Sequence, residues 1–195
     1  MELEKRTYSA SDLRVESREN GPPIITGHAS VFDVIGDGGW FREKVVPGAF
    51  SDSLGIDDIR MLWNHNTDLV MSRNHIGNPR GTLELAEDEK GLAIMATPPD
   101  TVLMRGYLDM IERGDVSQMS FGFQVLLRDW IEEENEKDLR LLKKIKLWEV
   151  SPVTFPFYKG TDVSLKAEHR QWRDSMVLPV YKSKLFRRRL NLPKR

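Results

Sequence analysis

The sequence contains no cysteine. This absence excludes a thiol nucleophile, thiolate metal sites and disulfide bonds, and it is typical of proteins that work in a reducing compartment. The N-terminus also lacks the apolar core of a signal peptide, and no apolar run is long enough to span a bilayer. We therefore expect a soluble protein that is not exported and has no membrane partner.

An excess of charge of one sign is missing as well. The 195 residues include 29 Lys and Arg against 30 Asp and Glu, which leaves a net charge of −1. Domains that coat nucleic acid are usually basic, so we expect no specific nucleic-acid partner. The exception is the basic tail, residues 179–195, which has no acidic residue. It is either a flexible, solvated end or an anchor for an acidic partner surface.

The familiar motifs for metals, phosphates and hydrolases are also absent. His65 and His75 are separated by ten positions and form no H-E-x-x-H motif, so we expect neither a metal nor a cofactor. The segment 36–39 lacks the Lys-Ser/Thr pair that completes a phosphate-binding loop. No G-x-S-x-G elbow is present, which argues against an α/β-hydrolase.

Short alternating segments dominate what is present. Strands are predicted near 24–32, 58–63, 118–130 and 139–150, with a loop over 66–80. A helix is predicted over 101–113, capped by Asp100, with a buried stripe of Leu103, Tyr107, Met110 and Ile111. This pattern predicts a mainly β or α+β fold. We divide the chain into an N-terminal extension (1–20), one domain (21–178) and the basic tail.

Three polar residues stand in apolar surroundings. Ser120 precedes Phe121 on a predicted strand, and the alternation places Ser120 on the same open face as Gly122. Glu149 follows Leu147 on a face that is otherwise apolar, so its carboxylate needs a partner, either a histidine or a basic side chain at the edge of the core. His65 comes directly after a predicted apolar strand.

Each of these residues also has an ordinary explanation. Ser120 can be a strand serine that is hydrogen-bonded to a backbone carbonyl, and His65 can be a histidine at the edge of the core. Ser151 is a rival nucleophile beside Glu149, although its place before Pro152 favours a strand end. Taken together, however, a hydroxyl, an imidazole and a carboxylate are the groups that activate a serine for attack on an amide.

The order of several short motifs resembles the prohead (capsid maturation) proteases of tailed bacteriophages. The resemblance covers roughly residues 24–165, and its pieces follow one another in a fixed order. They are Gly27, Ala29 and Phe32; Pro47 to Phe50; Asn64-His65; Asp88 to Leu92; the amphipathic helix; Ser120 to Phe123; and Glu149 to Val153, followed by Pro156.

This resemblance implies a herpesvirus-protease-like β-barrel surrounded by a few helices. It also implies a serine endopeptidase with His65, Ser120 and Glu149 as its triad. The expected substrates are the major capsid protein and its scaffold segment, with self-cleavage in addition. The expected location is the immature capsid in the cytoplasm of the host bacterium. The alternative is a non-catalytic, protease-like protein that binds capsid or scaffold during assembly.

Overall fold

The computed structural model describes residues 3–9, 12–19, 21–75, 77, 81–134, 136–155, 169–173 and 175. The chain forms two compact units, 1–159 and 160–195, and the strands belong to the first. In the second unit, residues 169–173 are helical. The basic tail (179–195) lies outside the described residues, so its predicted role stays a prediction, as do the predicted domain limits.

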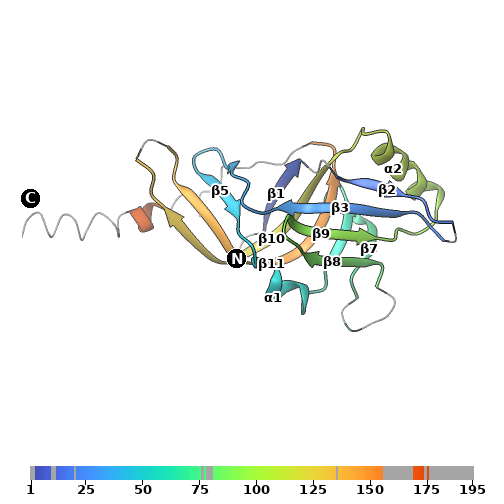
Figure 1. The fold of residues 1–195 in the computed structure, drawn as a ribbon, viewed down its shortest axis with the longest axis horizontal. Helices are drawn as coiled ribbons and strands as arrows, with labels where there is room; N and C mark the ends of the chain where they lie inside the picture. The colour runs from blue at the N-terminus through green and yellow to red at the C-terminus, as the bar shows by residue number, and fades with distance from the viewer. Residues whose placement is uncertain are drawn as a thin grey trace, which may run out of the picture. The chain divides into compact units, whose positions relative to one another are not determined.

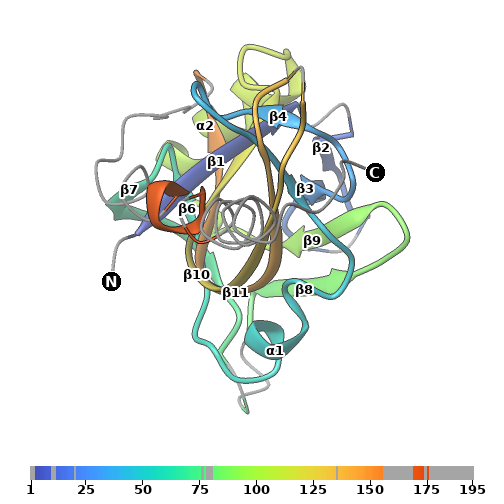
Figure 2. The ribbon, with the colours of Figure 1, turned by 90° about the vertical axis from the view of Figure 1, so that its left-hand side faces the viewer.

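A seven-stranded sheet carries most of the fold, with the strand order β1-β10-β11-β5-β4; in addition, β6 pairs with β11, and β7 pairs with β6. The long strands β10 and β11 pair antiparallel, and Figures 1 and 2 show them side by side as one extended hairpin. The strands are β1 (Glu4–Ser9), β4 (Gly36–Asp37), β5 (Arg42–Val45), β6 (Arg60–Trp63), β7 (Asn66–Arg73), β10 (Gln118–Ile131) and β11 (Leu139–Val153).

A second sheet has four strands in the order β2-β3-β9-β8. Its strands are β2 (Arg14–Glu16), β3 (Ile24–Val31), β8 (Leu83–Glu87) and β9 (Gly91–Ala96). The described residues of the first unit also form the helices α1 (Ser51–Leu54) and α2 (Val102–Glu112). β1 and β2 both fall in the segment 1–20, and each pairs with a different sheet. This segment therefore contributes a strand to each sheet.

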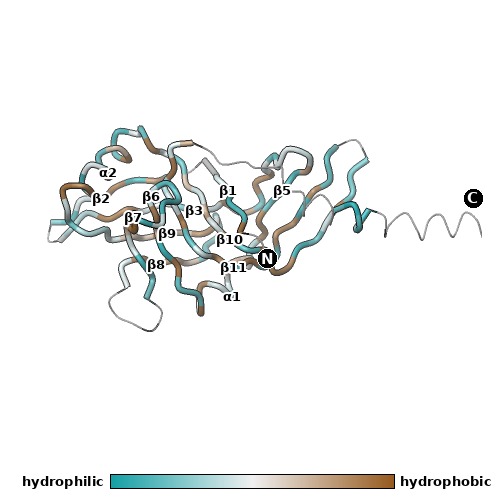
Figure 3. Tube along the Cα trace, turned by 180° about the vertical axis from the view of Figure 1, so that it is seen from behind, coloured by the Kyte–Doolittle hydropathy of each residue, from teal (hydrophilic) through white to brown (hydrophobic). Residues whose placement is uncertain are grey.

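The two sheets share one apolar core. Phe121 and Phe123 of β10 are fully buried, and Phe121 packs edge-on against Phe50 with ring centroids 5.5 Å apart. Ile25 and Ile94 of the second sheet belong to the same cluster. Figure 3 shows apolar and polar residues interleaved along the β10–β11 hairpin, which is the pattern expected where one face of a sheet is covered.

The mainly β class is confirmed, with few helices. The predicted closed barrel is not found, because the described strands pair into two sheets and neither sheet closes on itself. Strand alternation reveals which residues face the core, but it does not reveal whether the first and last strands of a sheet meet.

The predicted loop over 66–80 is wrong for its first half. Residues 66–73 form β7, which pairs antiparallel with β6. Only Met71 and Ser72 of this strand are buried, so the segment lacks the regular alternation that indicates a strand. The correction matters because β6 and β7 flank His65 directly.

The predicted helix is present, but its cap and its buried face differ from the prediction. Thr101, rather than Asp100, caps α2, because its side chain accepts a hydrogen bond from the backbone N–H of Met104. The buried stripe is Met104, Leu108 and Ile111, whereas Leu103 and Met110 are exposed. Both stripes have helical spacing, and the position of the sheet decides which one is covered.

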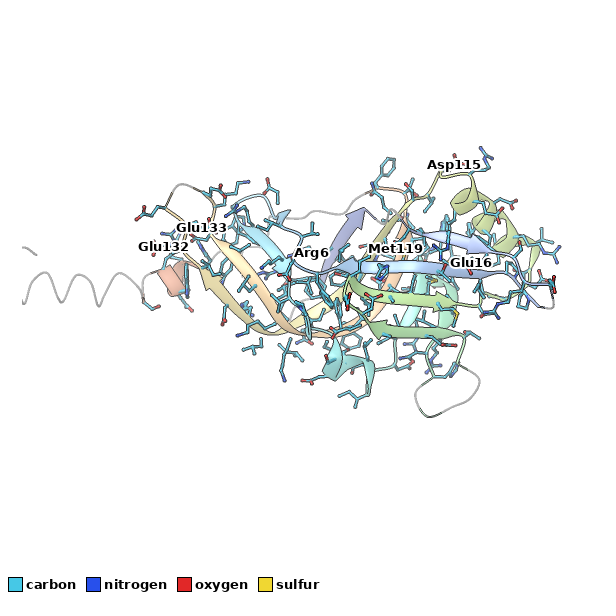
Figure 4. All side chains as sticks on the ribbon, viewed as in Figure 1. Arg6, Glu16, Asp115, Met119, Glu132 and Glu133 are labelled. Carbon is cyan, nitrogen blue, oxygen red and sulfur yellow. The ribbon has the colours of Figure 1, made fainter. Side chains whose placement is uncertain are left out.

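A buried ionic cluster joins β1, β5 and β11. Arg6 donates to Glu43 and Glu4 through Nε and Nη2, at 2.6 Å in both contacts, and Arg140 donates to the same two carboxylates. Arg140 is fully buried, and the exposed fractions of Arg6 and Glu43 are 6% and 3%. Figure 4 labels Arg6 on its ribbon. The two arginines and two glutamates balance each other in charge and tie β1 to the sheet.

Candidate active site

A tight turn presents His65. Trp63 of β6 pairs with Asn66 of β7, so only Asn64 and His65 form the turn, and both have positive φ, 53° and 61°. This is the backbone sign required at both central positions of a two-residue type I′ hairpin turn. A positive φ is uncommon in residues other than glycine, and such strain is often found at functional sites.

Hydrogen bonds from this turn to β11 hold it in place. The backbone N–H of Asn64 donates to the Pro152 carbonyl at 3.0 Å, and the N–H of His65 donates to Ser151 Oγ at 3.3 Å. On the other side, Trp63 stacks on Tyr107 of α2, with ring centroids 4.2 Å apart. The imidazole is therefore carried by a turn that is fixed from both sides.

His65 and Glu149 are hydrogen-bonded partners. His65 Nδ1 lies 2.7 Å from Glu149 Oε1, and the side chains of both residues are 9% exposed. The sequence left two kinds of partner open for Glu149, a histidine and a basic side chain. In the structure the partner is the histidine. With Glu149 ionised, Nδ1 carries the shared proton, and Nε2 is then the basic nitrogen of the ring.

Ser151 holds the other oxygen of the same carboxylate. Its hydroxyl donates to Glu149 Oε2 at 2.5 Å, and Ser151 is fully buried. From the sequence, Ser151 was an alternative candidate for the nucleophile. In the structure, its hydroxyl proton is donated to Glu149 instead.

Ser120 lies opposite Ser151 in the ladder between β10 and β11, and Gly122 lies opposite Glu149. Residues directly opposite each other in an antiparallel pair point to the same face, with Cβ atoms about 5 Å apart. Ser120 is fully buried, and its hydroxyl donates to the Arg6 carbonyl at 2.8 Å. This contact is the one expected of an ordinary strand serine. The structure therefore brings all three predicted residues to one region, but it shows the hydroxyl turned toward β1 and not toward His65.

Comparison with known families identifies the family of the chain. The model of the caudovirus prohead serine protease family matches residues 11–174 of the chain. The chain belongs to this family. Comparisons with curated proteins and with solved structures found no match. The match begins before the segment on which the resemblance was recognised, and it includes β2 as well as the whole candidate site.

Gly122 has a role that the sequence did not reveal. The alternation had placed Gly122 with Ser120 on an open face of the strand. Instead, the Glu149 side chain lies over it: a Cβ atom at position 122 would be 2.4 Å from Glu149 Oε1. The glycine therefore makes room for the carboxylate that binds His65, and only the pairing of the two strands reveals this.

A Gly122→Ala variant is expected to lose activity while keeping its fold. The new methyl group would displace the carboxylate, and a misplacement of about 1 Å can lower the rate on the order of 100-fold. The matched control is Gly106→Ala on α2, where a Cβ atom meets nothing within 4 Å. Rates of peptide-bond cleavage measured for both variants check the prediction. Equal activity in the two would show that Glu149 does not need this space.

No group of three or more His, Asp or Glu side chains in the described part of the protease is arranged to hold a metal ion. No helix among the described residues is long and apolar enough to cross a membrane. His28 lies between two carboxylates, with Nδ1 2.6 Å from Asp12 and Nε2 2.8 Å from Asp88.

Proposed function

We propose that this prohead protease is a serine endopeptidase that uses a Ser120, His65 and Glu149 triad. The observation that carries the proposal is the hydrogen bond of 2.7 Å between His65 and Glu149, on the sheet face that Ser120 shares. A shielded carboxylate bound to Nδ1 fixes the tautomer of the imidazole and stabilises its protonated form. A histidine with only a structural role does not require a glycine that makes room for its carboxylate partner.

The proposed mechanism is acyl transfer in two steps. Ser120 Oγ attacks the scissile carbonyl while His65 Nε2 accepts the hydroxyl proton, and a tetrahedral oxyanion forms. His65 then gives this proton to the leaving amine, and the peptide bond breaks to leave an acyl-enzyme. Water, deprotonated by the same imidazole, releases the acyl group and restores the Ser120 hydroxyl. Glu149 remains ionised throughout and stabilises the imidazolium.

The hydroxyl of Ser120 must leave the Arg6 carbonyl before it can react. A neutral hydrogen bond contributes about 1 kcal/mol, so breaking it lowers the reactive population by roughly fivefold, far less than catalysis gains. Rotation about the Cα–Cβ bond of Ser120 is enough to redirect the hydroxyl. Because Ser120 is fully buried, the substrate gains access only when a neighbouring segment moves, as the lids of many enzymes do.

The substrates that we propose follow from the family. A prohead serine protease is expected to cleave the major capsid protein and its scaffold segment, and also itself, inside the immature capsid in the cytoplasm of the host bacterium. A fold like that of the herpesvirus assembly protease belongs to the same proposal. Its support is the mainly β architecture with few helices.

A serine-reactive fluorophosphonate probe with peptide mapping tests the triad directly. We expect covalent labelling of Ser120 in the wild-type protein and loss of this labelling in a His65→Ala variant, because the probe reacts only with an activated hydroxyl. Labelling of Ser151 instead of Ser120 would assign the nucleophile to the other strand. An unlabelled protein that nevertheless cuts capsid protein would exclude a serine mechanism.

The competing function is that of a non-catalytic assembly protein with a protease-like fold. The burial of Ser120 and its bond to Arg6 favour this interpretation. Incubation with the capsid protein of the same phage separates the two functions. Discrete fragments indicate an endopeptidase, whereas stable binding without fragments indicates an assembly factor.

A further inference from the structure

Ser151 makes two hydrogen bonds that connect the members of the candidate site. Its hydroxyl donates to Glu149 Oε2 at 2.5 Å and accepts the backbone N–H of His65 at 3.3 Å. Ser151 is fully buried in β11, directly opposite Ser120. One side chain therefore contacts both the carboxylate and the turn that carries the imidazole.

We propose that Ser151 is a positioning residue that orients Glu149 and His65 for proton transfer. This inference rests on the proposed function, because it assigns the role of a fourth residue at the same site. Ser151 acts through Glu149 and the backbone of His65, and it makes no bond to the substrate.

The geometry of the carboxylate explains why a second partner is needed. Glu149 ends in a torsion between sp³ and sp² carbons, which has broad minima and allows the carboxylate to rotate. One hydrogen bond, from His65 to Oε1, leaves this rotation free. The second bond, from Ser151 to Oε2, fixes the plane of the carboxylate. Hydrogen bonds to an ionised acceptor are also stronger than neutral ones.

The hydroxyl of Ser151 is fully used by these two roles. A serine hydroxyl has one proton to donate and lone pairs with which to accept. The proton goes to Glu149, and a lone pair receives the N–H of His65. An alanine would leave both partners without this contact, and a larger side chain would have to displace buried neighbours. Ser151 therefore connects rigid strand β11 to the strained turn at Asn64 and His65.

The experiment is a double-mutant cycle between Ser151 and Glu149, with peptide-bond cleavage as the readout. We expect Ser151→Ala to lower kcat by about 10- to 100-fold, the loss of one hydrogen bond to a charged group, with KM nearly unchanged. In a Glu149→Ala background the same substitution should have a much smaller effect, because only the hydrogen bond from the His65 backbone is then lost. Ser30→Ala is the matched control, since Ser30 is an equally buried strand serine of the other sheet.

Two results would overturn the proposal. The first is a Ser151→Ala variant as active as Ser30→Ala. The second is an equal loss of kcat with and without the Glu149 side chain, since Ser151 would then act independently of the carboxylate. If Ser151→Ala fails to fold, Ser151→Cys replaces it in the cycle. The thiol is a weak donor of similar size, and an intermediate kcat is expected.

A second readout separates this inference from the proposed function. The Nδ1–H proton of His65 is expected as a distinct, slowly exchanging NMR signal in the inactive Ser120→Ala protein, assigned by its loss in a His65→Ala variant. It should exchange faster with water when Ser151→Ala is added. If Glu149→Ala cleaves like the wild type, the triad is wrong, and this signal still decides whether Ser151 orients His65. A signal unchanged by Ser151→Ala overturns the positioning role.

Discussion

Replacement of Ser120 by Ala is expected to abolish cleavage of capsid protein and to leave the fold intact. Triads lose roughly 10⁴- to 10⁶-fold in kcat when the nucleophile is removed. By contrast, the only hydrogen bond lost from the described structure is the one to the Arg6 carbonyl, which contributes about 1 kcal/mol to stability. Cleavage rates with capsid protein, together with a thermal unfolding curve, check both parts of the prediction.

Companion variants at the same site sharpen this test. His65→Ala should be about as inactive as Ser120→Ala, because the two residues act as a unit, whereas Glu149→Ala should retain more activity, because orientation is only part of the chemistry. Ser72→Ala serves as the matched control, since Ser72 is a buried serine of the same sheet, on β7. If Ser120→Ala cleaves as fast as the control, Ser120 is only a strand serine that is hydrogen-bonded to β1, and the proposed mechanism is wrong.

Alternation along β10 and β11 made much of the site predictable. Phe121 and Phe123 are both buried, as the pattern predicts, with ring centroids 4.8 Å apart. Glu149 is 7% exposed, in line with its apolar surroundings. Alternation with a period of two shows which side chains of a strand share a face, even when the partner strand is unknown. The sequence could therefore indicate which side chains near the site lie on the same face.

The features that depend on the partner strand could not be predicted. Asn64 and His65 form a turn without glycine, so the usual signal of a type I′ turn is missing. The space that Gly122 leaves for Glu149 exists only because β10 and β11 pair in one register. The contact between Ser151 and His65 depends on the pairing of β11 with β6. The same reason applies to Arg6 and its ionic cluster, whose members come from three strands that are far apart in the sequence.

Neutralising one glutamate of this ionic cluster is expected to have the largest effect on stability. In a Glu43→Gln variant, Arg6 and Arg140 would remain buried with one carboxylate fewer. Breaking a buried ion pair costs about 3–5 kcal/mol, a large part of the 5–15 kcal/mol that stabilises a typical protein. At about 2–4 °C per kcal/mol for a chain of this size, the melting temperature should fall by roughly 10 °C.

The pH dependence gives a second signature of the same cluster. Burial alone would raise the pKa of the Glu43 carboxyl, but the charges of Arg140 and Arg6 outweigh burial and hold the pKa below its ordinary value of 4.5. A lowered pKa stabilises the fold above the unfolded pKa, and this contribution is lost as the pH falls through the folded value. Between neutral pH and strongly acidic pH, the wild type should therefore lose more stability than Glu43→Gln does.

Glu16→Gln is the matched control, because Glu16 pairs with Arg14 at 2.7 Å on the exposed surface of the other sheet. Exposed pairs contribute little, since water screens them, so this variant should melt close to the wild type. If Glu43→Gln also melts like the wild type, the buried charges do not hold β1 in the sheet. The contact between β1 and Ser120 would then need another explanation, because the Arg6 side chain enters this cluster while its carbonyl accepts the Ser120 hydroxyl.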